Sequence, residues 1–207
     1  MALARVELNT IIYNAGVSAC KKGGQWAKAL GLLVDMALAR VEMDTITYNA
    51  TVSACEKGGQ WVEALRLLAD MAFACVAPDT ITYSAAVSAC EKGGQWAQAL
   101  QLLVDMSSNC VAMQTITCNA ALRACAKDGE WAQALSVLFS MASFSVDLDT
   151  ISYSTAASAC EKGGEWLKAL ELLADMEPVV DTLLYKLSAV FGNLRRSEHR
   201  ACHGHQT

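Results

Sequence analysis

A repeat of 35 residues constrains this chain more than any other feature of its sequence. Two residue types show it most clearly, because each recurs once per repeat. The two columns are Trp26, Trp61, Trp96, Trp131 and Trp166, and Met36, Met71, Met106, Met141 and Met176. A short unit that recurs at a fixed period predicts a solenoid, in which each unit packs on its neighbours.

The second copy, Thr45 to Asp79, shows how one unit is expected to fold. A first helix should run from Thr45 to about Lys57, with Asp44 or Thr45 as its N-cap and Gly58-Gly59 at its end. A second helix should follow from Gln60, because apolar residues recur there with helical spacing. These residues are Trp61, Ala64, Leu65, Leu68 and Met71. The sequence therefore predicts an all-α, right-handed α-solenoid of helix-turn-helix repeats.

The period divides the chain into five repeats with shorter segments at both ends. The repeats are 10–44, 45–79, 80–114, 115–149 and 150–181, of which the fifth is three residues short. Residues 1–9 are expected to be the tail of a partial repeat. We expect a capping helix at 182–196 and a disordered tail at 197–207.

Composition agrees with packed helices, since 54% of the residues are hydrophobic and only two are prolines. No run of about 18 uninterrupted apolar residues predicts a membrane span, and no signal or transit peptide is visible. Five of the nine cysteines occupy one position of the repeat: Cys20, Cys55, Cys90, Cys125 and Cys160. Equivalent positions of stacked helices lie ~8 to 10 Å apart, beyond the reach of a disulfide, so we expect reduced, packed thiols.

Motifs of enzymes and metal sites are missing from the sequence. There is no His-x-Glu with Cys-x-x-Cys, no P-loop and no nucleophile elbow. His199, Cys202, His203 and His205 lie too close together for a folded zinc site. We therefore expect no catalytic residue, no cofactor and no metal.

The first helix of each unit has two faces. The packing face of the second unit is Tyr48, Val52 and Cys55, and its other face is Ile46, Asn49, Ser53 and Lys57. Stacked units should align the second face into three columns along one groove. These are an apolar column of Ile11, Ile46, Ile81, Ile116 and Ile151, an amide or hydroxyl column of Asn14, Asn49, Ser84, Asn119 and Ser154, and a cationic column of Lys22, Lys57, Lys92, Lys127 and Lys162.

These three columns match what single-stranded RNA presents to a protein: a base face, a base edge and a phosphate. The net charge of −5 argues against a strong nonspecific phosphate binder. The pattern predicts a partner that is single-stranded RNA, not a DNA duplex or a membrane.

A specific resemblance follows from the motifs of the second unit. The unit reads Thr-Ile-Thr-Tyr-Asn at 45–49, then Ala-Cys-Glu-Lys-Gly-Gly, Glu-Ala-Leu, Met71 and Pro78-Asp79. It resembles the pentatricopeptide repeat of the P type, and the likeness extends from about Thr10 to Asp181. Tetratricopeptide units differ in having a 34-residue period and an early Trp.

The resemblance implies that the fifth and last residues of each unit jointly select one base, while the second residue packs against bases. The selecting pairs would be Asn14 with Asp44, Asn49 with Asp79, Ser84 with Gln114, Asn119 with Asp149, and Ser154 with Asp181. In that family Asn with Asp favours uridine, Ser with Asp favours guanosine, and Ser with Gln leans weakly towards a purine. The implied target is 5′-U-U-purine-U-G-3′, read from the first unit to the fifth.

The resemblance also implies a role in RNA processing, stabilisation, editing-site selection or translation in a mitochondrion or plastid. Other proteins would supply any catalytic activity. Unit four departs from the pattern, with Cys118 for the usual Tyr and Arg123 for the usual Ser.

Other interpretations stay open at this point. Each terminal Asp would also serve as the N-cap of the next helix. A groove of the same shape would suit a peptide, which would make the chain a protein-interaction scaffold. A third alternative is a fragment of repeats that binds nothing.

Overall fold

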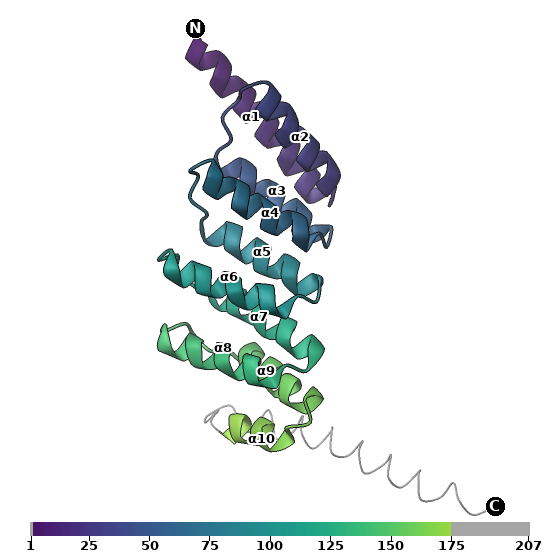
Figure 1. Ribbon diagram of the computed structural model, residues 1–207, viewed down its shortest axis with the longest axis vertical. Helices are drawn as coiled ribbons and strands as arrows, with labels where there is room; N and C mark the ends of the chain where they lie inside the picture. The colour runs from purple at the N-terminus through teal and green to yellow at the C-terminus, as the bar shows by residue number, and fades with distance from the viewer. Residues whose placement is uncertain (1, 175–207) are drawn as a thin grey trace, which may run out of the picture.

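The protein, described by a computed structural model, is a row of helix pairs (Figure 1). The structure describes residues 2–174, with the side chains of residues 2–9, 166, 171, 173 and 174 left out. In this range the regular elements are ten helices: α1 (Ala2–Lys22), α2 (Trp26–Leu38), α3 (Thr45–Lys57), α4 (Trp61–Phe73), α5 (Thr80–Lys92), α6 (Trp96–Ser108), α7 (Thr115–Asp128), α8 (Trp131–Ser143), α9 (Thr150–Lys162) and α10 (Trp166–Ala174). The expected α-solenoid is confirmed, while the predicted capping helix, the predicted tail and Asp181 lie outside the described residues.

The helices form two layers along the row (Figure 1). The first helices of the units, α1, α3, α5, α7 and α9, pack side by side in chain order. Each second helix from α2 to α8 packs on its own first helix and on the first helix of the next unit. Every unit therefore needs its neighbour to cover its apolar surface.

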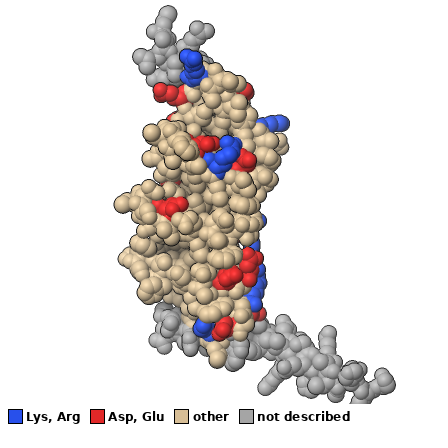
Figure 2. Space-filling model, in the orientation of Figure 1, with Lys and Arg blue, Asp and Glu red and all other residues tan. Residues whose placement is uncertain are grey.

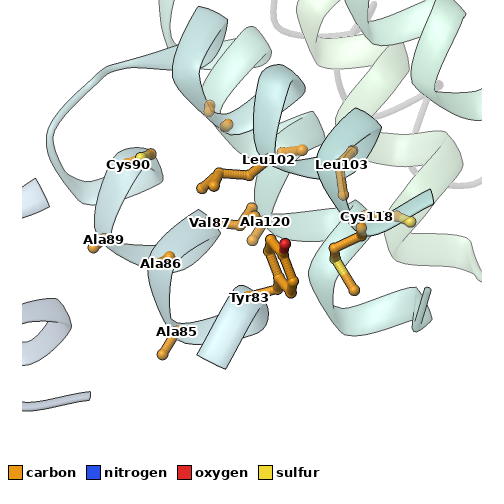
Figure 3. Packing of buried hydrophobic residues seen from close by; sticks show 14 of the residues in the cluster. Tyr83, Ala85, Ala86, Val87, Ala89, Cys90, Leu102, Leu103, Cys118 and Ala120 are labelled. Carbon is orange, nitrogen blue, oxygen red and sulfur yellow. The ribbon is translucent and has the colours of Figure 1, made fainter. Parts of the chain in front are cut away.

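The core runs continuously between the layers. Figure 3 shows Val87 of α5, Leu102 and Leu103 of α6 and Ala120 of α7 converging on one region of it. Met36, Met71, Met106 and Met141 are buried, which confirms the Met column as core.

The described cysteines are all free, as expected from their spacing. Cys55, Cys90 and Cys125 are fully buried, and burial raises the pKa of each of these thiols to about 11. A buried thiol with so high a pKa is protonated at neutral pH and acts as a small apolar side chain.

A Trp-Gly contact joins neighbouring units. A Cβ atom added at Gly58 would lie 2.3 Å from Cδ1 of Trp26, and one added at Gly93 would lie 2.3 Å from Cδ1 of Trp61. The glycines thus allow an indole of one unit to approach the first helix of the next. In unit four Asp128 occupies this position, and α7 is one residue longer than α3, α5 and α9.

Two kinds of turn end the helices. Gly59 follows α3 at φ 67°, and the next amide, of Gln60, donates to the Cys55 carbonyl at 2.9 Å. This confirms the predicted end of the first helix at two consecutive glycines. The second helices end instead with non-glycine residues at positive φ: Arg40, Cys75, Cys110 and Ser145, at 53° to 55°.

The first unit differs from expectation at its start. We expected its first helix to begin at Thr10, but α1 is continuous from Ala2 to Lys22. The segment 37–44 has nearly the same sequence as residues 2–9, but there the helix α2 ends at Leu38 and a turn and a loop follow. That loop contacts the preceding first helix, α1, through the bond between Asn14 and Asp44. The local sequence therefore does not decide between helix and loop.

Candidate functional site

The apolar column lies on the surface of the row of first helices. Ile11, Ile46, Ile81, Ile116 and Ile151 are 53% to 70% exposed. Each is the second residue of its unit, and its exposure contrasts with the buried Thr or Ser that follows it in units two to five. A branched apolar side chain held in water once per unit lacks a partner within the described chain, which makes this row a candidate binding surface.

In units one, two and four the Asn of the polar column is hydrogen-bonded to the terminal Asp of the same unit, which lies at the boundary with the next unit. Between units two and three, Asn49 Nδ2 donates to Asp79 at 3.1 Å and 2.9 Å from its two carboxylate oxygens. The same Asp79 caps α5, because its Oδ1 accepts from the backbone N–H of Thr82 at 2.9 Å. The predicted pair is therefore brought together, and the N-cap interpretation is confirmed for the same residue.

A third residue, Thr82, completes this cluster and was not predicted from the sequence. The Thr82 hydroxyl donates to Asn49 Oδ1 and also lies 2.9 Å from Asp79 Oδ1. Asn49, Asp79 and Thr82 form what we call a junction triad. A signal was present in the sequence, since Thr or Ser recurs at the third position of units two to five.

Two other boundaries carry a junction triad. They consist of Asn14, Asp44 and Thr47, and of Asn119, Asp149 and Ser152. The Asn-to-Asp distances are 3.4 Å at the first boundary and 3.1 Å at the fourth. Asp44 and Asp149 also cap their helices, so one carboxylate serves both packing and the polar column at each boundary.

The amides of the triads are less accessible than expected. Asn49 and Asn119 are only 8% and 4% exposed, and Ser53 is buried as well. The burial of Asn49 and Ser53 was not predicted from the sequence. The reason is that neighbouring first helices approach closely enough to cover these short side chains.

The triads affect the acidity of their carboxyl groups. Burial raises the pKa of Asp79, but hydrogen bonds from the Thr82 backbone, Asn49 and Thr82 outweigh burial, so the net pKa lies below its usual value. Asp44 and Asp149 have lowered pKa values for the same combination of causes. The three carboxylates are ionised at neutral pH and accept hydrogen bonds.

The boundary between units three and four has no triad. Ser84 replaces the Asn, Gln114 replaces the Asp, and Gln114 makes no side-chain cap for α7. Thr117 Oγ1 is, among the buried side-chain nitrogen and oxygen atoms of the described residues, the one without a hydrogen-bond partner. The fifth predicted pair cannot be placed, because Asp181 lies outside the described residues.

Some lysines of the cationic column form ion pairs, and these pairs were not predicted from the sequence. Lys92 Nζ lies 2.8 Å from Glu56 Oε1, and Lys127 Nζ lies 3.5 Å from Glu91 Oε1, each pair crossing a unit boundary. Arg123 also pairs with Glu91, at 3.1 Å. Among the described residues, Lys22, Lys57 and Lys162 take part in none of the ion pairs. Figure 2 shows one face on which acidic and basic side chains are few and lie beside one another.

Two further features of the described residues bear on the site. No group of His, Cys, Asp or Glu in this part of the chain is arranged to hold a metal ion. None of the helices described has both the length and the apolar character needed to cross a membrane.

Fold and surface together define a class of protein: an α-solenoid of two-helix units, each with an exposed apolar residue beside a polar cluster. Models of the pentatricopeptide repeat match the sequence, the PPR repeat family over 43–92 and the PPR repeat over 81–111, 116–146 and 151–177. Because these matches cover more than half of the chain, the protein belongs to the pentatricopeptide repeat family. A comparison with curated proteins finds no match.

Solved structures of this family are similar to the chain. The pentatricopeptide repeat protein PPR10 from maize is 28% identical, with a TM-score of 0.64 over 81% of this chain and 24% of that chain. PPR10 in complex with an 18-nt psaJ RNA element gives a TM-score of 0.69 at 24% identity, over 96% of this chain and 29% of the other. The chain thus spans about a quarter of PPR10.

A third solved structure agrees in fold. The PPR domain of Arabidopsis thaliana protein-only RNase P 1, in complex with tRNA, gives a TM-score of 0.70 at 14% identity. The similarity covers 86% of this chain and 97% of that domain, so a solenoid of this length exists as a domain of another protein.

Proposed function

We propose that the chain binds single-stranded RNA along its row of first helices, with one base at each unit. The fifth and last residues of each unit select the base, the second residue packs against it, and the cationic column neutralises phosphates. The proposed target is 5′-U-U-purine-U-G-3′, read from the first unit to the fifth. PPR10, which is similar over most of this chain, has been solved in complex with RNA.

The exposed isoleucine row is the observation that carries this proposal. Each isoleucine is more than half exposed and lies three residues before the polar side chain of its own unit. Stacking of a base on a protein side chain contributes about 1 to 3 kcal/mol in single-strand binding, before the cost of ordering the strand is subtracted. Five units of this kind support modest affinity.

The junction triad supports uridine as the preferred base of an Asn unit. A side-chain amide has two N–H donors and an oxygen with two lone pairs. Asp79 accepts a hydrogen bond from the amide nitrogen of Asn49, and the Thr82 hydroxyl donates one to its amide oxygen. Because one partner accepts and the other donates, the two bonds fix the orientation of the amide. The remaining donor and acceptor match the adjacent acceptor and donor on the edge of uracil.

The cellular role follows from the family and is part of the proposal. We place the chain in a mitochondrion or plastid, in RNA processing, stabilisation, editing-site selection or translation. The chain itself is proposed to have no catalytic activity, and other proteins would supply it. No membrane and no DNA duplex is needed for the proposed binding.

Fluorescence anisotropy with short unstructured RNAs tests this function. Strands containing U-U-G-U-G and U-U-A-U-G should bind more tightly than one containing C-C-G-C-A, at two salt concentrations. Asn49→Ser should shift the preference at its own base from uridine towards guanosine. Ile46→Ala should weaken binding of every strand about 5-fold, which corresponds to the lower end of the stacking range.

The matched control is Val62→Ala, which removes an exposed apolar side chain of α4, outside the row of first helices. It should leave RNA affinity unchanged. Equal affinity for all strands would remove base selection from the proposal. No RNA binding at all would reject it and favour a peptide-binding scaffold, whose affinity would depend little on salt.

A further inference from the structure

A positively charged pocket lies between the first helices of units three, four and five. It has a volume of about 320 Å³ and is lined by residues of α5, α7 and α9. Its charged lining residues are Glu91, Arg123, Lys127 and Lys162. Three cations and one carboxylate give the pocket a net charge of +2, in a chain whose overall charge is −5.

An equivalent pocket two units earlier has the opposite charge. It has a volume of about 220 Å³, and Ser53, Glu56, Ser84 and Ser88 are among its lining residues. Its lining contains a carboxylate and no cation. The positive charge therefore distinguishes this pocket from the earlier one, and the repeat as such does not produce it.

Two departures from the repeat pattern account for the difference. Arg123 occupies the position of Ser53, Ser88 and Ser158, and Ala126 occupies the position of Glu56, Glu91 and Glu161. Because Ala126 replaces the glutamate, Lys162 lacks the partner that Lys92 finds in Glu56, and it forms none of the ion pairs of the described residues. One departure adds a cation, and the other leaves a cation unpaired.

The surroundings of the pocket suit a phosphate group. Ser154, Thr155 and Ser158 also line it and provide hydroxyl donors beside the cations. The first helices end near it, and their C-terminal dipoles disfavour an anion, but these are partial charges that the pocket's net charge of +2 exceeds. Ser154 is also the residue proposed to select the base of unit five, so a phosphate here would be adjacent to that base.

We propose that Arg123, Lys127 and Lys162 bind a phosphate of the RNA backbone between units four and five. The inference rests on the proposed function. It adds Arg123 as a binding residue beside Lys127 and Lys162 of the cationic column. Lys92 in its pair with Glu56 contributes less.

The variant Ala126→Glu tests the site because it supplies the missing carboxylate without removing a cation. It should weaken binding of U-U-G-U-G RNA several-fold at low salt and reduce the slope of log affinity against log salt by about 0.7, the value for one phosphate of a single strand. Base preference should not change. Lys28→Ala on α2 is the control, because it makes the same change in net charge at an exposed position outside the pocket.

The reverse change provides a second measurement. Ser53→Arg with Glu56→Ala gives the earlier pocket the arginine and the alanine that distinguish the later one, and should strengthen binding and steepen the salt slope. An Ala126→Glu variant whose affinity and salt slope match those of Lys28→Ala would overturn the inference.

Failure of the proposed function would be seen separately, as absence of RNA binding by the unaltered chain. The pocket would then be judged with inorganic pyrophosphate at constant ionic strength. Pyrophosphate should raise the unfolding temperature of the unaltered chain and not that of Ala126→Glu, and equal shifts in both proteins would reject the site.

Discussion

The boundary between units two and three differs from the boundary between units three and four in the side chains that join the units. The first has Asn49, Asp79 and Thr82 in a closed triad and a tight Trp61-Gly93 contact. The second has Ser84 and Gln114 in place of the Asn-Asp pair, a buried Thr117 hydroxyl without a partner, and Asp128 in place of the glycine. Both boundaries nevertheless hold their first helices side by side, since α5 packs on α3 and α7 on α5. The triad is thus not required for this packing, and where it is present it adds stability and fixes the direction of an amide.

The Trp-Gly contact should give the largest difference between the boundaries. Gly93→Ala would place a Cβ 2.3 Å from Cδ1 of Trp61, and we expect it to lower the free energy of unfolding by about 2 to 3 kcal/mol, as in overpacked cores. Asp128→Ala at the equivalent position should change it by less than about 0.5 kcal/mol, because Asp128 is exposed. Urea unfolding followed by circular dichroism measures both, and similar losses would contradict the proposed role of the glycine.

Removal of the capping carboxylate should give the second largest difference between the boundaries. Asp79→Ala removes the cap of α5 and the partner of Asn49, so the expected loss is about 2 kcal/mol. Gln114→Ala should cost almost nothing, since Gln114 makes no side-chain cap. Equal costs in urea unfolding would contradict a stabilising role for the cap and for the triad.

The boundary between units three and four can also be given the triad that the boundary between units two and three has. Ser84→Asn with Gln114→Asp would give Thr117 the partners that Thr82 has, and should raise the free energy of unfolding by about 1 kcal/mol. Each single change should give less, because the two new groups depend on each other. Under the proposed function, the third base would change from purine to uridine, and an additive double-mutant cycle would refute the triad as a unit.

The two threonines give a smaller and more direct comparison. Thr82→Val removes a hydroxyl that bonds Asn49, with an expected loss of about 1 kcal/mol. Thr117→Val removes a buried hydroxyl that has no partner, so we expect no loss or a slight gain. Thermal unfolding of the two variants measures the difference, and an equal loss in both would mean that Thr117 finds a partner in solution.

Acid should weaken the boundaries that carry a triad. The pKa of Asp79 is lowered in the folded chain, so its contribution is complete above its unfolded value near 3.8 and is lost as the pH falls through the folded pKa. The stability advantage of the unaltered chain over Asp79→Asn should therefore be constant from pH 7 to about 5 and shrink below pH 4. An advantage that persists at pH 2 would contradict a role for the ionised carboxylate.

Much of the fold could be predicted because the repeat carries redundant information. The positions of Trp61, Met71 and Gly58-Gly59 recur in unit after unit, so helix limits and core columns followed from spacing. The Asn-Asp pairing came from the family resemblance, and the structure places Asn49 and Asp79 in contact. The capping role of Asp79 was visible from its place before a helix.

The features that were not predicted depend on how closely two units approach. Burial of Asn49 and the third contact from Thr82 arise where residues 33 positions apart meet. The Lys92-Glu56 pair likewise joins residues 36 positions apart, and no local pattern marks it as a pair rather than two solvated charges. The continuation of α1 through residues 2–9 was also not predicted, because the nearly identical segment 37–44 forms the end of α2 and a loop that contacts α1.

The small side chains between first helices have a consequence for any strand that the chain binds. Ala50 and Ala54 of α3 and Ala85 and Ala89 of α5 are buried where consecutive first helices meet. Their size sets the interval from one isoleucine of the exposed row to the next, and hence the interval at which bases would be presented. Under the proposed function, the accepted nucleotide spacing would be determined in the protein's interior, at residues that no RNA touches. A larger residue there would alter the match between protein and strand along its whole length.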